Sequence, residues 1–545
     1  MSNYKYSKAD TDNDENLGLH RPLSPSEASG LQTRSNHKPV TTDVATSKGL
    51  SQGSEDELAK PPNGLCSMRY LVTYLSCFGF FTTYMGRNTL SVAMTVMVNS
   101  TSNGYELYEM SHQNQSIGFQ VCHASVPTNM SIKGEDGPFH WSSWTQELIL
   151  ASGFYGFPWL QIPAGFLADA NGNAAVWLLA IGFGGSALCT LLTPFVAYQG
   201  VPLLVTVQII SGILQSWSYP VFIALMSRWA PPSERSRLAT IGTSGIPLGQ
   251  VIGQPIAGLW SSSESTGGWP SAFYFSGTLG LLCSIAWVFL VYPSPSAHPR
   301  ISPKERNYIE QNLRLESRKP ETYPWKSILT SGPVLAVCVA IFSHLWIIYL
   351  FMTNLPIYLK AVLHFDIKQT GFLAAVPFFF LWLVWIVGGR FADFLIDHTN
   401  FRVTTVRKFI TFLAFMPPAV LLVLMGYVGC NTTAIMVILT LGLSMNGLSM
   451  SGPTMCPLDF APSYAGIISA IANVFATTSG FLVPLLVAQF TEDQTDPRGW
   501  KIVFWISAVI MMFGMVFFLI FGTSELQSWA RRTEDDNKNE FDSES

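Results

Sequence analysis

The sequence predicts an all-α membrane protein that crosses the bilayer twelve times, in two six-helix halves. Composition is the first observation, because 48% of the 545 residues are hydrophobic and only 12% are charged, whereas about a quarter of the residues of soluble proteins are charged. Patterning is the second. The charges gather in residues 1–69, near 300–326 and after Glu525, and between them lie continuous apolar runs of about 20 residues, the length at which a helix spans the hydrocarbon core. A β-barrel is excluded because its strands alternate between apolar and polar residues.

Twelve such runs follow one another along the chain. They lie near residues 70–98, 144–168, 174–195, 202–226, 239–260, 270–292, 333–357, 370–389, 408–428, 434–457, 464–489 and 501–522. Most connections are short, and two are long, at 99–143 and 293–332. We therefore expect an N-terminal half over 70–292, a linker over 293–332 and a C-terminal half over 333–522.

The distribution of Lys and Arg among the loops predicts the orientation. Fourteen of these residues lie in loops on the side of the termini (Arg228, Arg235, Arg237, Arg300, Lys304, Arg306, Arg314, Arg318, Lys319, Lys326, Arg390, Arg402, Arg407 and Lys408), and five lie opposite (Lys133, Lys360, Lys368, Arg498 and Lys501). Positive loops stay in the cytosol, so both termini are expected there. The polar segments 1–69 and 523–545 are expected to be cytosolic tails, disordered over residues 1–69 and after Arg532.

Glycosylation sequons agree with this orientation. Asn99, Asn114, Asn129 and Asn431 each begin an N-x-S/T pattern, and all four fall on the predicted non-cytosolic side. Asn114 and Asn129 lie farthest from the membrane and are the expected glycan carriers.

A short repeat is the third observation behind the two-half prediction. GFLAD spans Gly165–Asp169 and GRFAD spans Gly389–Asp393, and each follows the second span of its half. Parallel repeats of this kind place a substrate site between the halves, near the middle of the membrane. Asp169 and Asp393 themselves are expected to cap or contact neighbouring helix ends.

Several function classes find no support in the sequence. No G-x-x-x-x-G-K-[ST] pattern occurs, so ATP is not expected to drive the protein directly. The eight cysteines have no CxxC or metal-ligand spacing and are expected to be core residues, although Cys122 and Cys430 lie on the same side and are able to pair. An enzyme would need a cluster of His, Asp or Glu near one membrane face, whereas His344 stands alone. We expect no cofactor and no nucleic-acid partner.

Arg87, within TTYMGRNTLSVAM (82–94), is the main candidate for a functional residue. Charged residues inside spans are rare and usually face a cavity or a partner. A guanidinium presents a planar fork of donors that suits carboxylate or phosphate. Arg87 is therefore predicted to bind an anion, and the structural alternative is a side chain that pairs with carbonyls at a helix end.

Five motifs resemble the major facilitator superfamily, and within it solute carrier family 17, over residues 65–530. They are RNTLSVAM (87–94), FYGFPWLQIPAGFLA (154–168), WAPPSERSRLAT (229–240), TTVRK (404–408) and LDFAPSYAGIISAIAN (458–473). The G-x-x-A-D repeats resemble the loop signature of the superfamily, with Asn171 and Asn173 where basic residues usually follow. The resemblance implies transport of organic anions, with Arg87 matching the arginine that the family uses on them.

Other positions depart from the family pattern. The arginine and the glutamate of the fourth helix, the latter a candidate for proton coupling, are replaced by Gln208 and Gln215. His344 stands where glutamate transporters have an arginine, and it is interpreted equally well as an anion or proton ligand or as a packing residue. Cys456 and Pro457 replace an Asn-His pair, which argues against a glutamate transporter.

The resulting hypothesis is a secondary active transporter, or symporter, of a small organic or inorganic anion. Its expected substrate-binding residues are Arg87, His344, Gln208, Gln215 and Tyr155, and H+, Na+ or the membrane potential is the driving force. Its partners are the anion and the bilayer, with no obligate protein partner, in a lysosomal, vesicular or plasma membrane. The alternative is a sensor or scaffold that keeps the fold without transport.

Two further expectations concern charged residues near the span ends. Glu234, Arg235 and Arg237, in the loop after the fourth span, are expected to form ion pairs that hold one conformation. Glu147, at the start of the second span, is expected to be solvated.

Overall fold

The computed structural model describes residues 67–99, 137–263, 265, 267–314, 323–398, 401–429 and 431–530. Asn114, Asn129, Cys122 and Cys430, together with most of the two predicted tails, lie outside these residues. The regular structure of the described residues is helical, apart from one isolated bridge between Val98 and Phe139.

The N-terminal half contains six membrane segments, three of them in two pieces. They are α1 (Met68–Met97), α3 (Ser143–Tyr155) with α4 (Gln161–Ala170), α5 (Gly172–Gln199), α6 (Val201–Ser216) with α7 (Ser218–Trp229), α8 (Pro232–Thr243) with α9 (Gly245–Ser261), and α10 (Trp269–Leu290). In the described part of the linker, η2 (Pro295–Ala297), α11 (Pro303–Arg314) and α12 (Trp325–Thr330) follow.

The C-terminal half also contains six segments. They are α13 (Gly332–Ala361), α14 (Ile367–His398), α15 (Val403–Met425), α16 (Thr432–Asn446) with η3 (Gly447–Met450), α18 (Ala465–Thr477) with α19 (Ser479–Phe490), and α20 (Pro497–Phe521). The short α17 (Cys456–Phe460) and η4 (Pro462–Tyr464) precede α18. The predicted order of two six-segment halves is confirmed.

Nine segments of the described chain are long and apolar enough to cross a membrane. The other three predicted spans are α1, α3 with α4, and α8 with α9. Proline explains two breaks along the chain, because a proline has no N–H to donate to the carbonyl four residues earlier. Pro158 lies between α3 and α4, and Pro247 follows the junction of α8 and α9 at Ser244.

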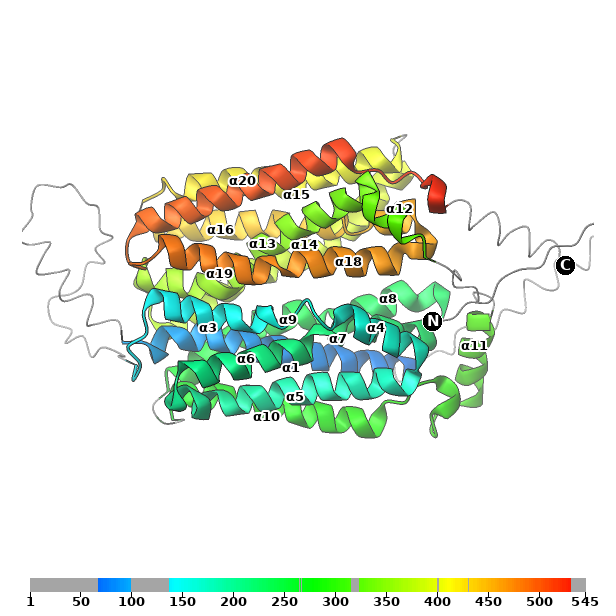
Figure 1. The fold of residues 1–545 in the computed structure, drawn as a ribbon, viewed down its shortest axis with the longest axis horizontal. Coiled ribbons are helices and arrows are strands. Elements are labelled where there is room, and N and C mark those ends of the chain that lie inside the picture. The colour runs from blue at the N-terminus through cyan, green and yellow to red at the C-terminus, as the bar shows by residue number, and fades with distance from the viewer. Residues whose placement is uncertain are drawn as a thin grey trace, which may run out of the picture. The chain divides into compact units, whose positions relative to one another are not determined.

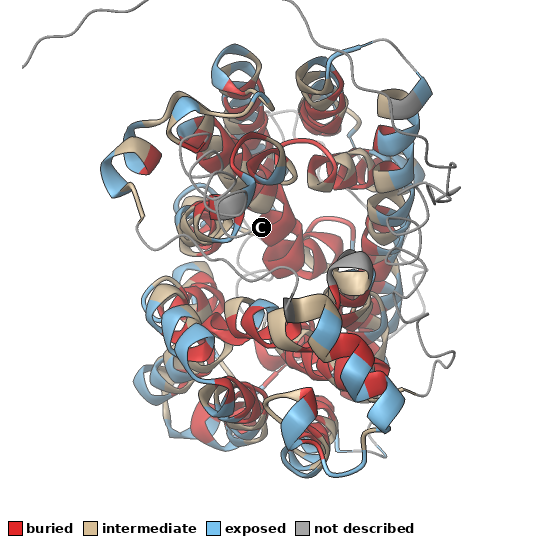
Figure 2. Cartoon of the chain, turned by 90° about the vertical axis from the view of Figure 1, so that its right-hand side faces the viewer, coloured by how far each residue is buried: buried red, intermediate tan, exposed pale blue. Residues whose placement is uncertain are grey.

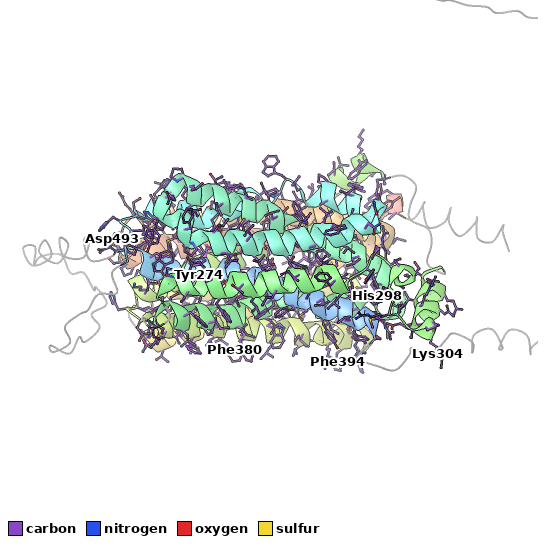
Figure 3. All side chains as sticks on the ribbon, turned by 90° about the horizontal axis from the view of Figure 1, so that it is seen from below. Tyr274, His298, Lys304, Phe380, Phe394 and Asp493 are labelled. Carbon is purple, nitrogen blue, oxygen red and sulfur yellow. The ribbon has the colours of Figure 1, made fainter. Side chains whose placement is uncertain are left out.

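The helices of the two halves run side by side in Figure 1, with α1, α5, α6 and α10 on one side and α15, α16 and α18–α20 on the other. We call the end where α1 ends and α3 begins the first-loop end, and the end that carries α11 the linker end. Asp493 marks the first-loop end in Figure 3, and His298 and Lys304 mark the linker end.

Apolar side chains cover the outward faces of the bundle. Buried residues gather where helices face one another (Figure 2), whereas large side chains such as Phe380 and Phe394 are exposed on the outside (Figure 3). An apolar surface of this extent suits lipid rather than water.

Ion pairs hold elements together at the linker end. Arg69, at the start of α1, is only 2% exposed; its Nε lies 2.8 Å from Glu234 Oε2 and its Nη1 lies 3.4 Å from Glu305 Oε1. Glu234 lies in the first turn of α8 and Glu305 in the first turn of α11, so this cluster ties the linker to the N-terminal half. In the C-terminal half, Arg407 Nε lies 2.9 Å from Asp459 Oδ2.

The other residues expected at this end take different positions. The guanidinium of Arg237 lies 5.9 Å from the ring centroid of Tyr70, and Arg235 lies on α8. Both G-x-x-A-D repeats lie inside helices, α4 and α14, rather than after them. At the end of α4, Arg228 Nη2 donates to the backbone carbonyls of Ala168 and Asp169, at 3.1 and 2.7 Å. Asp393 is exposed.

Glycines allow close helix contacts within and between the halves. A Cβ at Gly245, the first residue of α9, would overlap the backbone oxygen of Cys77 on α1. Between the halves, a Cβ at Gly371 of α14 would lie 2.7 Å from Gln254 O and 3.2 Å from the Cα of Gly258, both on α9. Small residues let membrane helices approach in this way.

We expect Gly245→Ala to destabilise the protein, because the added methyl group meets backbone that cannot move aside. Overpacking of this kind costs about 1–3 kcal/mol, which should lower the thermal midpoint measured by size-exclusion chromatography of heated, detergent-solubilised protein. Gly466→Ala is the matched control, since a Cβ there meets nothing within 4 Å and alanine favours the helix. Equal midpoints for the two variants would contradict this account of the α1–α9 contact.

Candidate functional site

A pocket lies inside the bundle, between helices of the N-terminal half and α13. It contains about 570 Å³ of space not occupied by atoms, part of it open to solvent. Its polar lining comes from α1 (Arg87, Asn88, Ser91), α5 (Thr190, Thr193), α6 (Gln208, Ser211, Gln215) and α13 (Thr353). Apolar side chains of α3, α10 and α13, among them Phe154, Phe273 and Met352, complete the wall. Among these lining residues Arg87 alone carries a charge.

The guanidinium of Arg87 is held by aromatic rings. Its central carbon lies 4.7 Å from the ring centroid of Phe154, 4.6 Å from that of Phe157 and 5.7 Å from that of Tyr84. Cations bind to ring faces at such distances. Both terminal nitrogens are buried, and no described residue accepts a hydrogen bond from them. A charged donor left unpaired inside a protein is costly, so this arrangement suits a site that a ligand completes.

Asn88 extends the set of unpaired polar groups. Its side chain is fully buried, and neither its amide oxygen nor its amide nitrogen has a hydrogen-bond partner among the described residues. Buried amides are normally hydrogen-bonded. Asn88 follows Arg87 directly in the quoted motif, and only that adjacency could have marked it in the sequence.

Gln208 and Gln215 lie two turns apart on α6 and both line the pocket. Gln208 Nε2 donates to Thr193 Oγ1 at 3.2 Å, and Gln215 Nε2 donates to Ser211 Oγ at 3.0 Å. Each glutamine is therefore positioned by a neighbouring hydroxyl group. The structure brings these two glutamines together with Arg87.

His344 and Tyr155 do not line this pocket. His344 is 3% exposed; its Nδ1 lies 2.7 Å from Asn446 Oδ1 and 2.6 Å from Ser449 Oγ, so its polar contacts lie within the C-terminal half. Tyr155 ends α3, where its ring stacks on Phe481 with 5.3 Å between centroids. These placements match the packing interpretation of His344.

The expectation that Glu147 is solvated is wrong. Its side chain is fully buried on α3, which packs against α6 of its own half and α19 of the other, and Asn354 of α13 lies beside its carboxyl. When the side-chain amide of Asn354 is oriented with its nitrogen toward Glu147, that nitrogen lies 2.6 Å from Oε1 and 3.0 Å from Oε2. Nothing near Glu147 in the sequence signals this partner, which comes from the opposite half.

Comparison with known proteins agrees with the fold and the motifs. Residues 76–484 match the family model described as Major Facilitator Superfamily. The chain belongs to this superfamily, within solute carrier family 17. It is 36% identical to sialin of Ovis aries over 90% of this chain and 98% of that protein. It is 33% identical to sodium-dependent phosphate transport protein 3 of Mus musculus, over 88% of this chain and 98% of the relative. The protein is thus a membrane transporter by family and not an enzyme.

A third relative and two solved structures complete the comparison. Vesicular glutamate transporter 3 of Danio rerio is 34% identical over 85% of this chain and 74% of that protein. A bacterial homologue of the lysosomal transporter Spinster superposes with a TM-score of 0.61 at 11% identity, covering 85% of this chain and all of the other. A D-xylose–proton symporter gives 0.60 at 14% identity, covering 84% and 100%. At these identities the likeness shows the fold alone.

We expect substitution of His344 to affect stability, and substitution of Gln208 to leave it nearly unchanged. His344→Leu leaves the buried amide of Asn446 without the ring nitrogen, at a cost of about 1–3 kcal/mol. Gln208→Leu removes only a donor, and Thr193 Oγ1 keeps its 2.9 Å bond to the Cys189 carbonyl. Thermal midpoints of the two variants, measured in the same detergent, check the difference. A stable His344→Leu variant would refute the packing role.

Proposed function

We propose that this protein is a secondary active transporter of a small organic or inorganic anion, working by alternating access around the pocket at Arg87. One observation carries the proposal: the two terminal nitrogens of Arg87 are buried beside the pocket without a hydrogen-bond acceptor among the described residues. A carboxylate or phosphate group supplies that acceptor and the balancing charge. Two parallel bonds between a guanidinium and such an anion are strong and specific in geometry.

The surroundings of Arg87 favour a negative ligand. Phe154 and Phe157 place ring faces, not carboxylates, beside the guanidinium, so its positive charge is not neutralised by an ion pair with a described residue. In an environment poor in water such a charge acts strongly on a ligand. The amides of Asn88, Gln208 and Gln215 add neutral hydrogen-bonding groups, which suit the hydroxyl or amine groups of an organic anion.

The named relatives support the anion class. Sialin, a phosphate transporter and a vesicular glutamate transporter each resemble this chain over most of its length. Sialate, acidic amino acids and phosphate are thus the first substrates to test. Cys456 and Pro457, which replace the Asn-His pair of glutamate transporters, make glutamate the least favoured of these.

Contacts across the halves identify what a transport cycle has to break. At the first-loop end, Ser143 Oγ donates to the Thr491 carbonyl at 2.7 Å, and Lys360 donates to the Thr95 carbonyl. Nearer the linker end, Asn473 Nδ2 donates to Gln161 Oε1 at 3.0 Å. Rocking the halves apart at one end and then the other would expose the pocket alternately. Loop charges favour placing the first-loop end outside the cytosol, toward the lumen of a lysosome or vesicle or the cell exterior.

Uptake into proteoliposomes tests the proposal. We would offer phosphate, sialate, aspartate, glutamate and urate separately, under a potential, a pH gradient or a sodium gradient. We expect flux of at least one anion. Arg87→Gln should reduce that flux about tenfold to a hundredfold, because a hydrogen bond to a charged group contributes about 1.5–3 kcal/mol. Arg87→Lys should retain part of it, since the charge remains while the planar fork is lost.

Arg498→Gln is the matched control, because Arg498 is exposed and its Nε lies 3.4 Å from Asp496 Oδ2, far along the chain from the pocket. Its flux should equal that of the unchanged protein. Flux that survives Arg87→Gln would remove Arg87 from the site. Specific anion binding without any flux would favour the sensor alternative. That alternative is based on Gln208 and Gln215, which replace a charged arginine and glutamate of the family.

A further inference from the structure

We propose that Glu147 is a proton-binding carboxyl that couples anion transport to the opening and closing of the first-loop end. This inference rests on the proposed function and deepens it, since it names the proton as the coupling ion. The fourth-helix glutamate of the family is replaced by Gln215, and Glu147 lies on a different helix, α3. The interface between α3 and α13 thus offers a carboxyl that the sequence patterns did not indicate.

The carboxyl of Glu147 is buried between the two halves. Its side chain has no solvent exposure, and its neighbour Asn354, 1% exposed, lies on α13. The 2.6 and 3.0 Å distances between the two side chains are hydrogen-bond distances. Glu147 and Asn354 therefore meet only while the halves are closed at this end.

Within the part of the chain that the structure describes, no cation pairs with the carboxyl of Glu147. The titratable side chains on the helices packed against α3 are as follows: Arg69, Tyr70, Tyr74, Cys77, Tyr84 and Arg87 on α1, Cys338, His344, Tyr349, Tyr358 and Lys360 on α13, and none on α6 or α19. Lys360 donates to the Thr95 carbonyl instead. A buried carboxylate without a cation is expensive, whereas the neutral acid is not.

The amide of Asn354 is able to pair with either protonation state. With its oxygen toward Glu147, it accepts the O–H of the neutral acid, and its nitrogen donates to Thr353 Oγ1 at 2.7 Å. With its nitrogen toward Glu147, it donates to the carboxylate, and its oxygen accepts from the same hydroxyl at 2.7 Å. The single hydroxyl proton of Thr353 then turns to the amide oxygen from the Tyr349 carbonyl, to which it otherwise donates. Rotation of the Asn354 side-chain amide by half a turn therefore lets it pair with Glu147 both before and after the carboxyl gains a proton.

Position links this proton site to both the gate and the pocket. Glu147 lies about one turn along α3 from Ser143, whose hydroxyl donates to the Thr491 carbonyl across the halves. In the opposite direction, Ile149 and Leu150 line the pocket, and so does Thr353, the partner of Asn354. The carboxyl thus lies between the contacts that close the first-loop end and the place where Arg87 would hold an anion.

The proposed step is one reversible protonation. When the halves part at the first-loop end, the carboxylate becomes solvated and takes a proton from that compartment, forming an O–H bond. The neutral acid is then buried against Asn354 as the halves close. The O–H bond breaks when the proton leaves on the pocket side, after the linker end opens. One proton and one monovalent anion move in the same direction, with no net charge transferred and no oxidant or reductant involved.

Proteoliposomes under a pH gradient, with the potential clamped to zero, test the inference. Phosphate, sialate and glutamate are the probes, each offered alone. A gradient of about one pH unit should drive about tenfold accumulation per coupled proton, since one unit corresponds to 1.36 kcal/mol. Glu147→Gln mimics the neutral acid and should close normally. It should therefore retain anion exchange between equal concentrations on the two sides of the membrane. Its ratio of internal to external anion under the pH gradient should fall from about ten to about one.

Glu492→Gln is the matched control, because Glu492 is exposed in the loop at the same end. It should accumulate the anion like the unchanged protein. Accumulation retained in Glu147→Gln overturns the inference. A second measurement needs no variant at Glu147: a pH-sensitive dye trapped inside should report acidification during anion uptake by the unchanged protein. Anion uptake without that proton movement also overturns the inference.

Asn354→Leu adds an independent variant. It keeps Glu147 but removes the amide that hydrogen-bonds to both the carboxylate and the neutral acid of Glu147. We expect it to slow pH-driven uptake more than exchange, and equal effects on the two would count against the proposal. Exchange by the unchanged protein separates the two levels of the argument. If no probe is exchanged, the proposed anion transport fails and the inference with it; if exchange occurs but pH does not drive accumulation, the inference alone fails.

Discussion

Keeping a guanidinium inside a membrane bundle without a carboxylate beside it is the constraint from which the rest of this structure follows. Arg87 cannot lose its charge at any physiological pH, so the surrounding helices have to make the charge tolerable without cancelling it. Phe154 and Phe157 do this with ring faces. The glutamines and hydroxyl groups of α5 and α6 supply polarity without opposing charge. A carboxylate in contact with Arg87 would satisfy the arginine permanently, and the pocket would lose its attraction for an anion.

The carboxyl of Glu147 is kept apart from that arginine, although both lie within the same bundle. Glu147 finds an amide on the opposite half, and Arg87 finds aromatic rings on its own half. Two opposite charges that paired directly would hold the halves in one arrangement and oppose the movement that transport needs. Separate neutral partners leave each group free to respond to its own ligand, an anion in one case and a proton in the other. Arg69 is the buried arginine that does pair with carboxylates, and it does so at the linker end, with Glu234 and Glu305.

Much of this architecture could be predicted from the sequence, because the length of a continuous apolar run indicates a helix that spans the membrane. The predicted run at 370–389 was nevertheless too short: α14 extends to His398, because Arg390 and Asp393 interrupt the apolar sequence without ending the helix. Arg87 stood out because its charge conflicts with its apolar surroundings. Gln208 and Gln215 could be placed only through the resemblance. His344 and Glu147 show the limit, because residue type and depth in a span do not reveal which helix lies opposite, whether in the same half, as for His344, or in the other, as for Glu147. The hydrogen-bond partner of His344 is Asn446 and that of Glu147 is Asn354. Both asparagines are remote in sequence from the residue they contact.

The ion pairs of Arg69 with Glu234 and Glu305 also determine where the polypeptide could be cut into two fragments. Because Glu305 comes from α11 and contacts the start of α1, this linker helix belongs structurally to the first half of the chain rather than to a neutral hinge. Two halves of six segments each suggest a boundary directly after α10. Cutting the chain there would separate Arg69 from Glu305, one of its two carboxylate partners. A pair of co-expressed fragments divided after α11 would keep each cluster of charges intact on its own piece. The place at which the transporter can be divided into two chains that reassemble is therefore set by this buried charge cluster as much as by the count of helices.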